Sequence, residues 1–355
     1  MTAKELLQQR LANQQLISPA YGTAPEVVKW CGAIQAQDYE MSKWAVGMRM
    51  PAATTEQIET SISKGELVRT HILRPTWHLV HREDVRWMMA LSAPSIEQSM
   101  GTYNRKLELD STVFRKSQKV FEKALKDGKQ LTRPELAAIL EKAKIPTNDL
   151  RMNFLLIKAE LDMVICNGGK RDKQITYALF EERVPATSKT LTKEESLAAL
   201  ALRYFNSHGP ATLKDFTGWS GLPITAARQG LNLVKDQLNK YAVYDLEYWD
   251  PTPASDLKST DRQVLLIPNY DEYLVAYKDR DIIYDGQHDD HLSREGNPLF
   301  NNVILIKGQI AGVWKRTIKK KEIVMDLQTF TPLNKTEQAK LDKEVARYKQ
   351  FIHLQ

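Results

Sequence analysis

Two stretches of the chain repeat one pattern, and this repeat limits the possible folds more than any other feature of the sequence. Thr132 and Thr212 each precede a short helical pattern and have an acidic residue three positions later, which is typical of a capped helix start. A break and a second helical pattern follow in both copies, at residues 150–166 and 224–238. Helix, turn, helix and a two-stranded ribbon is the arrangement of a winged helix. We therefore predict tandem winged-helix modules.

The expected ribbons complete these two modules. In the earlier copy, a turn at 168–170 stands before a strand at 174–180. In the later copy, strands are expected at 240–244 and 246–249, and a helix at 194–207 precedes the module. Each ribbon is the feature that distinguishes a winged helix from a plain pair of helices.

The N-terminal part of the chain fits a third, less regular copy. Helical patterns occupy residues 3–13, 25–34 and 55–64, and strand patterns occupy residues 67–72 and 77–80. Three modules in one chain are therefore expected.

From about residue 263, short runs of strand-forming residues replace the helical patterns of the modules. The runs lie at 264–267, 303–306, 309–314 and 322–327, and a helical pattern at 335–351 ends the chain. We predict an α+β fold of three winged-helix modules followed by a small C-terminal antiparallel β-barrel or sheet with a terminal helix. The expected divisions are 1–115, 116–188, 189–255 and 256–355.

Composition narrows the class of protein. With 355 residues, 42% apolar and 26% charged, the chain is an ordinary globular protein without a run of membrane-spanning length. Two cysteines are too few for a disulfide framework, and the N-terminus reads as an amphipathic helix, so we expect a cytoplasmic protein. The net charge of +6 and a basic block at 315–321 permit nucleic-acid binding, although solvated strand faces or turns explain the block equally well.

Gln35-Ala36-Gln37 places two neutral amides two residues apart where an apolar helix runs out. Such amides can position a water molecule without deprotonating it, because an amide is not a base near neutral pH. Residues two apart share a face only in an extended segment, so a shared water requires Gln35 and Gln37 to lie outside a helix. Without other support, helix capping or backbone hydrogen bonding is the better explanation. Asp38 follows directly, and its carboxylate is a rival for the same water.

A second polar cluster lies on the expected strand–turn–strand that follows. Arg69 and His71 alternate along one strand, and Arg74, Thr76 and His78 share parity after the turn. These side chains either grip a phosphate or sugar, or form a buried polar network within the module.

The acidic stretch after strand 264–267 has two readings. Asp271, Glu272 and Tyr273 either act on a cation or a water, or pair with Lys278 and Arg280 as a structural clasp.

Other chemistries find little support. The loop His288–His291 is better explained as a polar loop than as a metal site, and residues 166–170 lack phosphate-loop spacing. No lysine is marked as a Schiff-base nucleophile. We expect no cofactor and no metal.

Four stretches together resemble a known family. They are Gly32–Gln37 (GAIQAQ), Val68–Val80 (VRTHILRPTWHLV), Arg203–Leu222 and Pro268–Arg280 (PNYDEYLVAYKDR), and 312–316 adds a fifth match. The chain resembles the AlkZ-like family of bacterial winged-helix DNA glycosylases over nearly its whole length.

The resemblance implies a C-shaped, tandem winged-helix enzyme that excises alkylated purines, and some members unhook interstrand crosslinks. The family's catalytic signature is Gln-hydrophobic-Gln or Gln-hydrophobic-Asp, so Gln35 and Gln37 are the implied catalytic residues. Here the middle residue is only Ala36, and the adjacent Asp38 leaves the carboxylate form open. Auxiliary roles are assigned to Asp38, His71, Arg74, Thr76, His78, Asp271 and Tyr273.

The expected partner is double-stranded DNA with alkylated purines, bound by a monomer in the bacterial cytoplasm and at the nucleoid when engaged. Phosphate contacts are expected from Arg69, Arg228, Lys278, Arg280, Lys315, Arg316 and Lys319. The alternatives are a non-catalytic winged-helix regulator that reads bases through the helix at 224–238, and a structural accessory of DNA repair.

Overall fold

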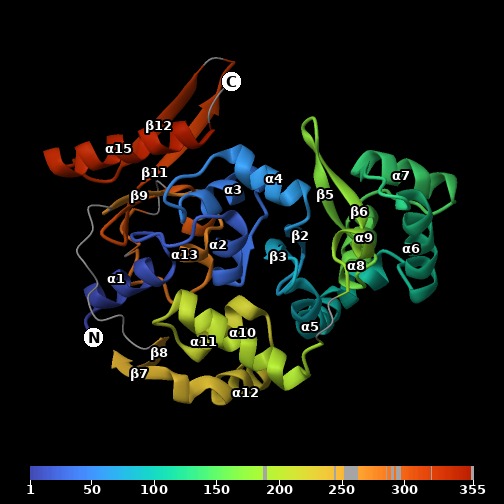
Figure 1. Cartoon of the computed structure of the whole chain (residues 1–355), viewed down its shortest axis with the longest axis horizontal. Coiled ribbons are helices and arrows are strands. Elements are labelled where there is room, and N and C mark those ends of the chain that lie inside the picture. The colour runs from blue at the N-terminus through green and yellow to red at the C-terminus, as the bar shows by residue number, and fades with distance from the viewer. Residues whose placement is uncertain are drawn as a thin grey trace.

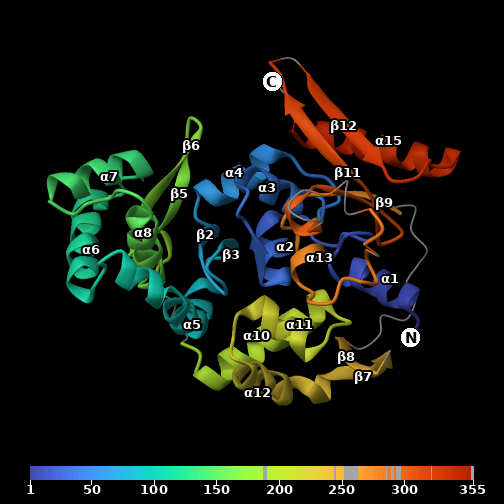
Figure 2. The same cartoon turned by 180° about the vertical axis from the view of Figure 1, so that it is seen from behind.

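The structure is a computed structural model. It describes residues 1–186, 190–243, 245–251, 263–284, 286–288, 292, 297–320 and 322–352. Tyr244 of an expected strand, residues 289–291 of the His288–His291 loop and Lys321 of the basic block lie outside the described residues. Figures 1 and 2 show a central body with a separate helical lobe on one side and a projecting sheet and helix on the other.

The first module contains a three-stranded antiparallel sheet in the order β1-β3-β2. Its elements are α1 (Ala3–Asn13), α2 (Ala24–Cys31), β1 (Ala33–Gln35), α3 (Tyr39–Gly47), α4 (Thr55–Ser63), β2 (Leu67–His71) and β3 (Trp77–His81). The helix expected at 25–34 ends at Cys31, because Gly32 has φ +80° and turns the chain out of the helix. Residues 33–35 form β1 instead, and α3 was not predicted from the sequence.

The second module is the separate lobe in Figure 1. The long helix α5 (Val85–Lys106) leads to α6 (Ser111–Leu125), β4 (Leu131–Thr132), α7 (Arg133–Lys142), α8 (Arg151–Leu161), β5 (Ile165–Arg171), β6 (Gln174–Leu179) and α9 (Phe180–Arg183). The helix predicted at 150–166 ends at Leu161, because Met163 adopts a left-handed conformation with φ +56°. The strand β5 continues past the expected turn at 168–170. The expected division at 115/116 falls inside α6.

The third module covers one side of the first (Figure 1). It consists of α10 (Lys193–His208), α11 (Leu213–Ser220), α12 (Ile224–Val234), β7 (Leu238–Val243) and β8 (Leu246–Pro251). A single antiparallel bridge joins Ala211 to Trp249 before α11. The order of helix, strand or bridge, two helices and two strands thus occurs in all three modules, as in a winged helix.

The C-terminal part is an open antiparallel sheet in the order β12-β11-β10-β9 within the described residues. The prediction of a small sheet is confirmed, whereas the barrel alternative is not seen there. Its elements are β9 (Val264–Ile267), α13 (Glu272–Val275), β10 (Val303–Ile306), β11 (Gln309–Ile318), β12 (Ile323–Thr329) and α15 (Lys335–Ile352). Trp44 of α3 donates a hydrogen bond to the Leu266 carbonyl over 2.7 Å, which ties this sheet to the first module.

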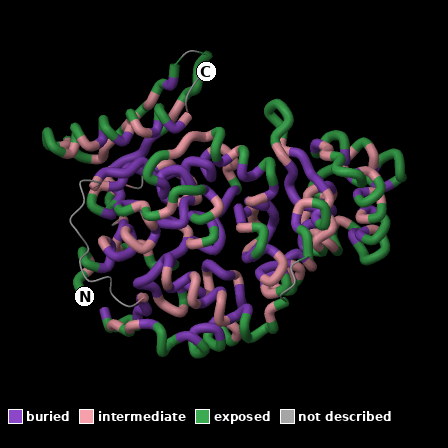
Figure 3. Tube along the Cα trace, viewed as in Figure 1, coloured by how far each residue is buried: buried purple, intermediate pink, exposed green. Residues whose placement is uncertain are grey.

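Buried residues gather into large clusters that cross the module divisions (Figure 3). One cluster joins the first module to the C-terminal sheet. A second joins the first module to the third and takes in part of the second, which also has a core of its own. The first module therefore shares its buried core with the parts of the chain on either side of it. The strand β1 lies within this shared core. Within the described residues, no helix has the length and apolar character needed to span a membrane.

Candidate active site

The Gln35–Gln37 segment lies between β1 and α3, outside any helix. Gln35 is the last residue of β1 and is only 8% exposed, whereas Gln37 is exposed. The Ala36 N–H donates to the Trp77 carbonyl over 2.7 Å, so the extended strand pairing continues one residue beyond β1. This backbone meets the condition that the shared-water model sets for the two amides.

Comparison of the three modules shows why the segment is unusual. In the second module, the N-cap residue Thr132 is the last residue of the strand β4. In the third module, the N-cap residue Thr212 directly follows the bridge residue Ala211. In the first module, Ala36 and Gln37 separate the strand from the N-cap Asp38. The motif is therefore an addition at the strand–helix junction. The Asp38 carboxylate accepts the Met41 N–H over 3.1 Å, so it caps α3.

The buried amide of Gln35 is fixed by Arg74. Arg74 Nη2 donates to Gln35 Oε1 over 3.0 Å and lies 3.2 Å from His78 Nε2, while Nη1 donates to the Trp219 carbonyl. Because a guanidinium only donates, the Gln35 oxygen must face Arg74. His78 pairs with Gln35 across the β1–β3 ladder, so their side chains share one face.

His78 is a neutral acceptor in this arrangement. Its Nδ1 lies 2.9 Å from the Thr76 carbonyl, which can only accept, so Nδ1 carries the proton and Nε2 faces Arg74. Burial and the charge of Arg74 lower the pKa of His78 to about 3. The imidazole orients Arg74 and does not exchange protons near neutral pH. The Thr76 hydroxyl is buried and has no hydrogen-bond partner among the described residues.

Glu272 holds the backbone at the motif from the C-terminal part of the chain. Its Oε1 accepts the Gln35 N–H over 2.8 Å and its Oε2 accepts the Trp219 Nε1–H over 2.7 Å. His208 Nε2 lies 3.5 Å from the same carboxylate. Burial would raise the pKa of Glu272, but the hydrogen bond and charge of His208 and the charge of Arg74 lower it to about 2. An ionised carboxylate is thus buried behind the motif.

Sequence reasoning did not assign this role to Glu272, nor roles to Trp219 and His208. All three lie inside stretches that carry the family resemblance, and Glu272 also stands in the acidic stretch that the sequence singled out.

Arg69 and His71 face the second module, away from solvent. Arg69 is 5% exposed, and its guanidinium donates to the Ala36 carbonyl and to Asn167 Oδ1. His71 Nδ1 contacts the buried Glu160 carboxylate. The expectation that Arg69 contacts phosphate does not fit this burial. Both residues belong to a buried polar network, but this network reaches Asn167 and Glu160 of the second module and does not stay within the first.

The side chains of Asp271 and Tyr273 are bonded to other groups in the protein interior. The Asp271 carboxylate forms a fully buried ion pair with Arg49 and caps α13. The Tyr273 hydroxyl donates to the Gly308 carbonyl over 2.9 Å. Asp271 therefore pairs with Arg49, and the described residues show no ion pair between Asp271 and Lys278 or Arg280 as the clasp hypothesis required.

The expected DNA-contacting cations are spread over the molecule. Lys278, Lys315, Lys319 and Arg228 are exposed. Arg228 lies on α12, and Figure 1 shows α10 and α11 between that helix and the first module. Lys315 lies on β11 and Lys319 directly follows it, and β11 projects from the body together with β12 (Figure 1). Lys319 pairs with Glu322 over 2.8 Å.

The two remaining arginines are already engaged. Arg316 donates to the Tyr348 hydroxyl on α15. Arg280 donates from Nε to the Leu274 carbonyl over 2.8 Å, and partial burial lowers its pKa. Neither is as free for a phosphate as the four exposed cations.

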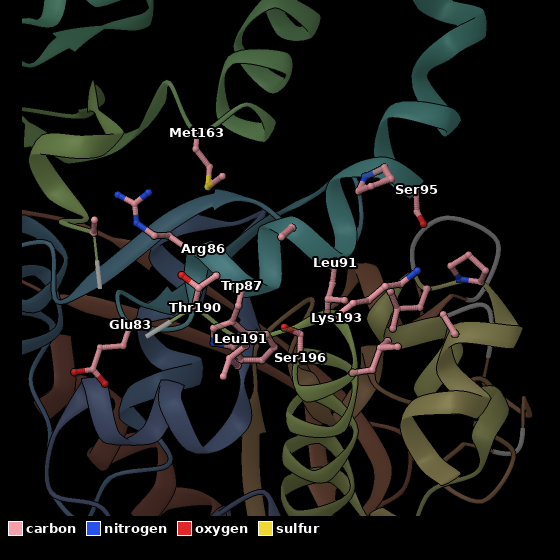
Figure 4. A pocket seen from close by; sticks show the side chains of 17 residues that line it. Glu83, Arg86, Trp87, Leu91, Ser95, Met163, Thr190, Leu191, Lys193 and Ser196 are labelled. Atoms are coloured by element: carbon pink, nitrogen blue, oxygen red, sulfur yellow. The ribbon is translucent and has the colours of Figure 1, made fainter. Parts of the chain in front are cut away.

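A cavity of about 670 Å³ lies elsewhere, where α5, α10 and α12 meet (Figure 4). Trp87, Leu91, Met163 and Leu197 contribute to its mainly apolar wall, and Lys193 and Ser196 add polar groups. Gln35 and Gln37 are not among its lining residues. The candidate site is instead a strand end whose second amide faces the outside.

The class of protein follows from the comparison with known protein families. The chain belongs to the family "DNA glycosylase AlkZ-like", whose model matches residues 28–351. This membership confirms the resemblance seen in the sequence.

A particular relative is the interstrand DNA cross-link repair glycosylase of Streptomyces sahachiroi, which is 25% identical over 350 residues, or 92% of this chain and 90% of the relative. The solved structure of the Streptomyces sahachiroi DNA glycosylase AlkZ superposes with a TM-score of 0.78 at 21% identity, covering 99% of this chain and 96% of that one. The fold is therefore shared over nearly the full length of both proteins.

Proposed function

We propose that this protein is a monofunctional DNA glycosylase that hydrolyses the N-glycosidic bond of cationic N7- or N3-alkylated purines, including purines within interstrand crosslinks. Membership of the glycosylase family and the name of the relative support the reaction class. The observation that carries the proposal is the extended Gln35–Gln37 segment, with one amide fixed and the other exposed.

For this reaction, the protein needs to do little more than position a water molecule against the sugar. An alkylated purine already carries positive charge, so the pair of electrons in its bond to C1′ leaves with the base and neutralises it. A water oxygen then bonds to C1′, and its extra proton goes to solvent. Holding the water in line with C1′ contributes most of the catalysis, and such positioning lowers a barrier by up to roughly 7–11 kcal/mol in the best geometries.

The two glutamines take unequal roles in this proposal. The exposed amide of Gln37 holds the water, because its carbonyl is free to face a sugar at the surface. Gln35 fixes the position of the strand end, since its oxygen accepts from Arg74 and its N–H donates to Glu272. Asp38 is assigned to capping α3.

The environment suits a cationic transition state. The ionised Glu272 offsets the charge of Arg74 behind the strand, so the positive sugar does not meet an uncompensated guanidinium. The exposure of Gln37 also suits a bulky lesion that a closed pocket would exclude. Exposed Lys278, Lys315 and Lys319 are the proposed phosphate contacts of a monomer on duplex DNA.

The test is product release from a duplex that carries N7-methylguanine, in parallel with a duplex carrying a crosslinked purine. We expect free base and an abasic site with wild-type protein, and background release with the Gln35→Ala/Gln37→Ala double variant. Gln338→Ala is the matched control, because Gln338 is an exposed glutamine on α15 whose side chain donates to the exposed Asp342. Absence of release from both duplexes would refute the enzyme and favour a DNA-binding protein. Equal release by the double variant would refute the assigned site.

A further inference from the structure

Arg69 grips the backbone at the centre of the motif. Its Nε and Nη2 donate to the Ala36 carbonyl over 3.1 and 2.9 Å. The guanidinium also lies over the Trp77 ring at 4.4 Å, and the Trp77 carbonyl accepts the Ala36 N–H. The N–H and the carbonyl of Ala36 are therefore both held in hydrogen bonds, the N–H by Trp77 on β3 and the carbonyl by Arg69 on β2.

The remaining nitrogen of the same guanidinium bonds to the second module. Arg69 Nη1 donates to Oδ1 of Asn167, which lies on β5 at the irregularity of the β5–β6 ladder. Asn167 Nδ2 donates to Glu160 of α8 over 3.5 Å, and Glu160 accepts the His71 N–H over 2.8 Å. All four side chains are buried. One guanidinium thus joins the motif backbone directly to the second module.

A second contact between the same two parts lies close by. Lys170 of β5 pairs with Glu40 over 2.6 Å, and Glu40 stands in the first turn of α3, directly after the motif and its cap. The strand β5 therefore contacts both ends of the Gln37–Asp38 turn, through Arg69 before it and through Glu40 after it.

We propose that Arg69 is a positioning residue, through which docking of the second module onto the first sets the direction of the Ala36 carbonyl and so the placement of the Gln35 and Gln37 amides. This proposal rests on the proposed glycosylase function. Two donors on one carbonyl fix its direction as well as its distance, which the single point charge of a lysine does not do. The site is then active only while the second module is seated.

The first test compares single-turnover excision of N7-methylguanine by wild type and Arg69→Gly at saturating enzyme. We expect the rate constant to fall by about tenfold or more, with the Kd for DNA changed less than threefold, because Arg69 does not reach the DNA. Guanidinium ion at tens of millimolar should restore much of the rate by occupying the vacated site. Arg69→Lys should not restore it.

Arg86→Gly is the matched control. Arg86 lies on α5, the helix that leads from the first module into the second, and it ties this helix to Glu181 and the Val184 carbonyl without a contact to the motif among the described residues. We expect this variant to lose thermal stability while keeping the wild-type excision rate. Equal loss of rate in Arg69→Gly and Arg86→Gly, without rescue by guanidinium, would overturn the proposal.

Hydrogen–deuterium exchange tests the positioning without relying on activity. In Arg69→Gly and in Asn167→Ala, the peptide that covers residues 33–39 should exchange about tenfold faster, and guanidinium should slow it again in the first variant only. Arg86→Gly should leave this peptide unchanged. Unchanged exchange in Asn167→Ala would refute the link to the second module. Inactivity of the wild type would refute the glycosylase function, but the exchange measurement would still decide whether the second module positions the motif.

Discussion

Replacing Glu272 by Gln should weaken the junction behind the motif while hardly changing its volume. In the wild type, the two carboxylate oxygens accept separate donors, the Gln35 N–H and the Trp219 indole N–H. A glutamine keeps one acceptor oxygen and presents an NH₂ group in place of the other. One of the two buried donors must then face another donor.

The expected loss follows from these contacts. Hydrogen bonds to a charged group contribute about 1.5–3 kcal/mol each, and a buried donor left without an acceptor costs about 1–3 kcal/mol. We therefore expect Glu272→Gln to lower the free energy of unfolding by about 2–5 kcal/mol at pH 7.

The pH dependence gives an independent value. The pKa of Glu272 is lowered from 4.5 to about 2 in the folded protein, so its ionised form stabilises the fold above pH 4.5. That contribution is lost as the pH falls through the folded value. A shift of this size corresponds to about 3 kcal/mol. The difference between wild type and Glu272→Gln should therefore shrink between pH 4.5 and pH 2.

Urea unfolding followed by tryptophan fluorescence measures both effects, because Trp219 is in contact with the altered side chain. Glu83→Gln is the control, since Glu83 forms an exposed ion pair with Lys29 that contributes less than about 1 kcal/mol. Stability of Glu272→Gln within about 0.5 kcal/mol of wild type at pH 7 would refute the reasoning. A full difference that persists at pH 2.5 would refute the charge argument.

Three further outcomes follow from the structure. Burial raises the pKa of Asp250 from 3.8 to about 7, so the fold loses stability as the pH rises from about 4 to about 7 and loses no more above that, and Asp250→Asn should gain stability relative to wild type over this range in thermal melts. Gly221 has φ +68° and a Cβ there would stand 2.0 Å from the Leu73 carbonyl oxygen, so Gly221→Ala should lower the Tm, and an unchanged Tm would contradict the packing of α11 on the first module. Lys315→Ala and Lys319→Ala should each reduce the slope of log Kd for DNA against log salt by about one, whereas an unchanged slope would place the duplex away from β11.

Much of the fold was accessible from local patterns. The strands at 264–267 and 303–306 and the helix at 3–13 occur as predicted, because unbroken apolar runs and a capped amphipathic start are local signals. The helix at 25–34 was predicted three residues too long, since a glycine that ends a helix looks the same in sequence as one that is tolerated within it. The helix α3 was missed because residues 41–47 are all buried, so the helix has no exposed face whose spacing would mark it in the sequence.

The candidate site was accessible only in part. The motif residues were found through a family resemblance, but Glu272 is 237 positions from Gln35, and no local pattern links the two. Arg69 looked like a phosphate contact because alternation along a strand does not tell a solvent face from a face covered by another module. Its partners, the Ala36 carbonyl and Asn167, are defined only by tertiary packing.

The central claim is that the Gln37 amide, beside the strand end that Gln35 fixes, positions the attacking water, and single-turnover kinetics at saturating enzyme test it most directly. Rate constants for release of N7-methylguanine should fall by about 100-fold or more in Gln37→Ala, as when one positioned catalytic group is removed, with the Kd for DNA unchanged. Gln35→Ala should fall by a smaller factor, because Glu272 still holds the backbone of that residue. Rate constants within threefold of wild type for both variants would contradict the account.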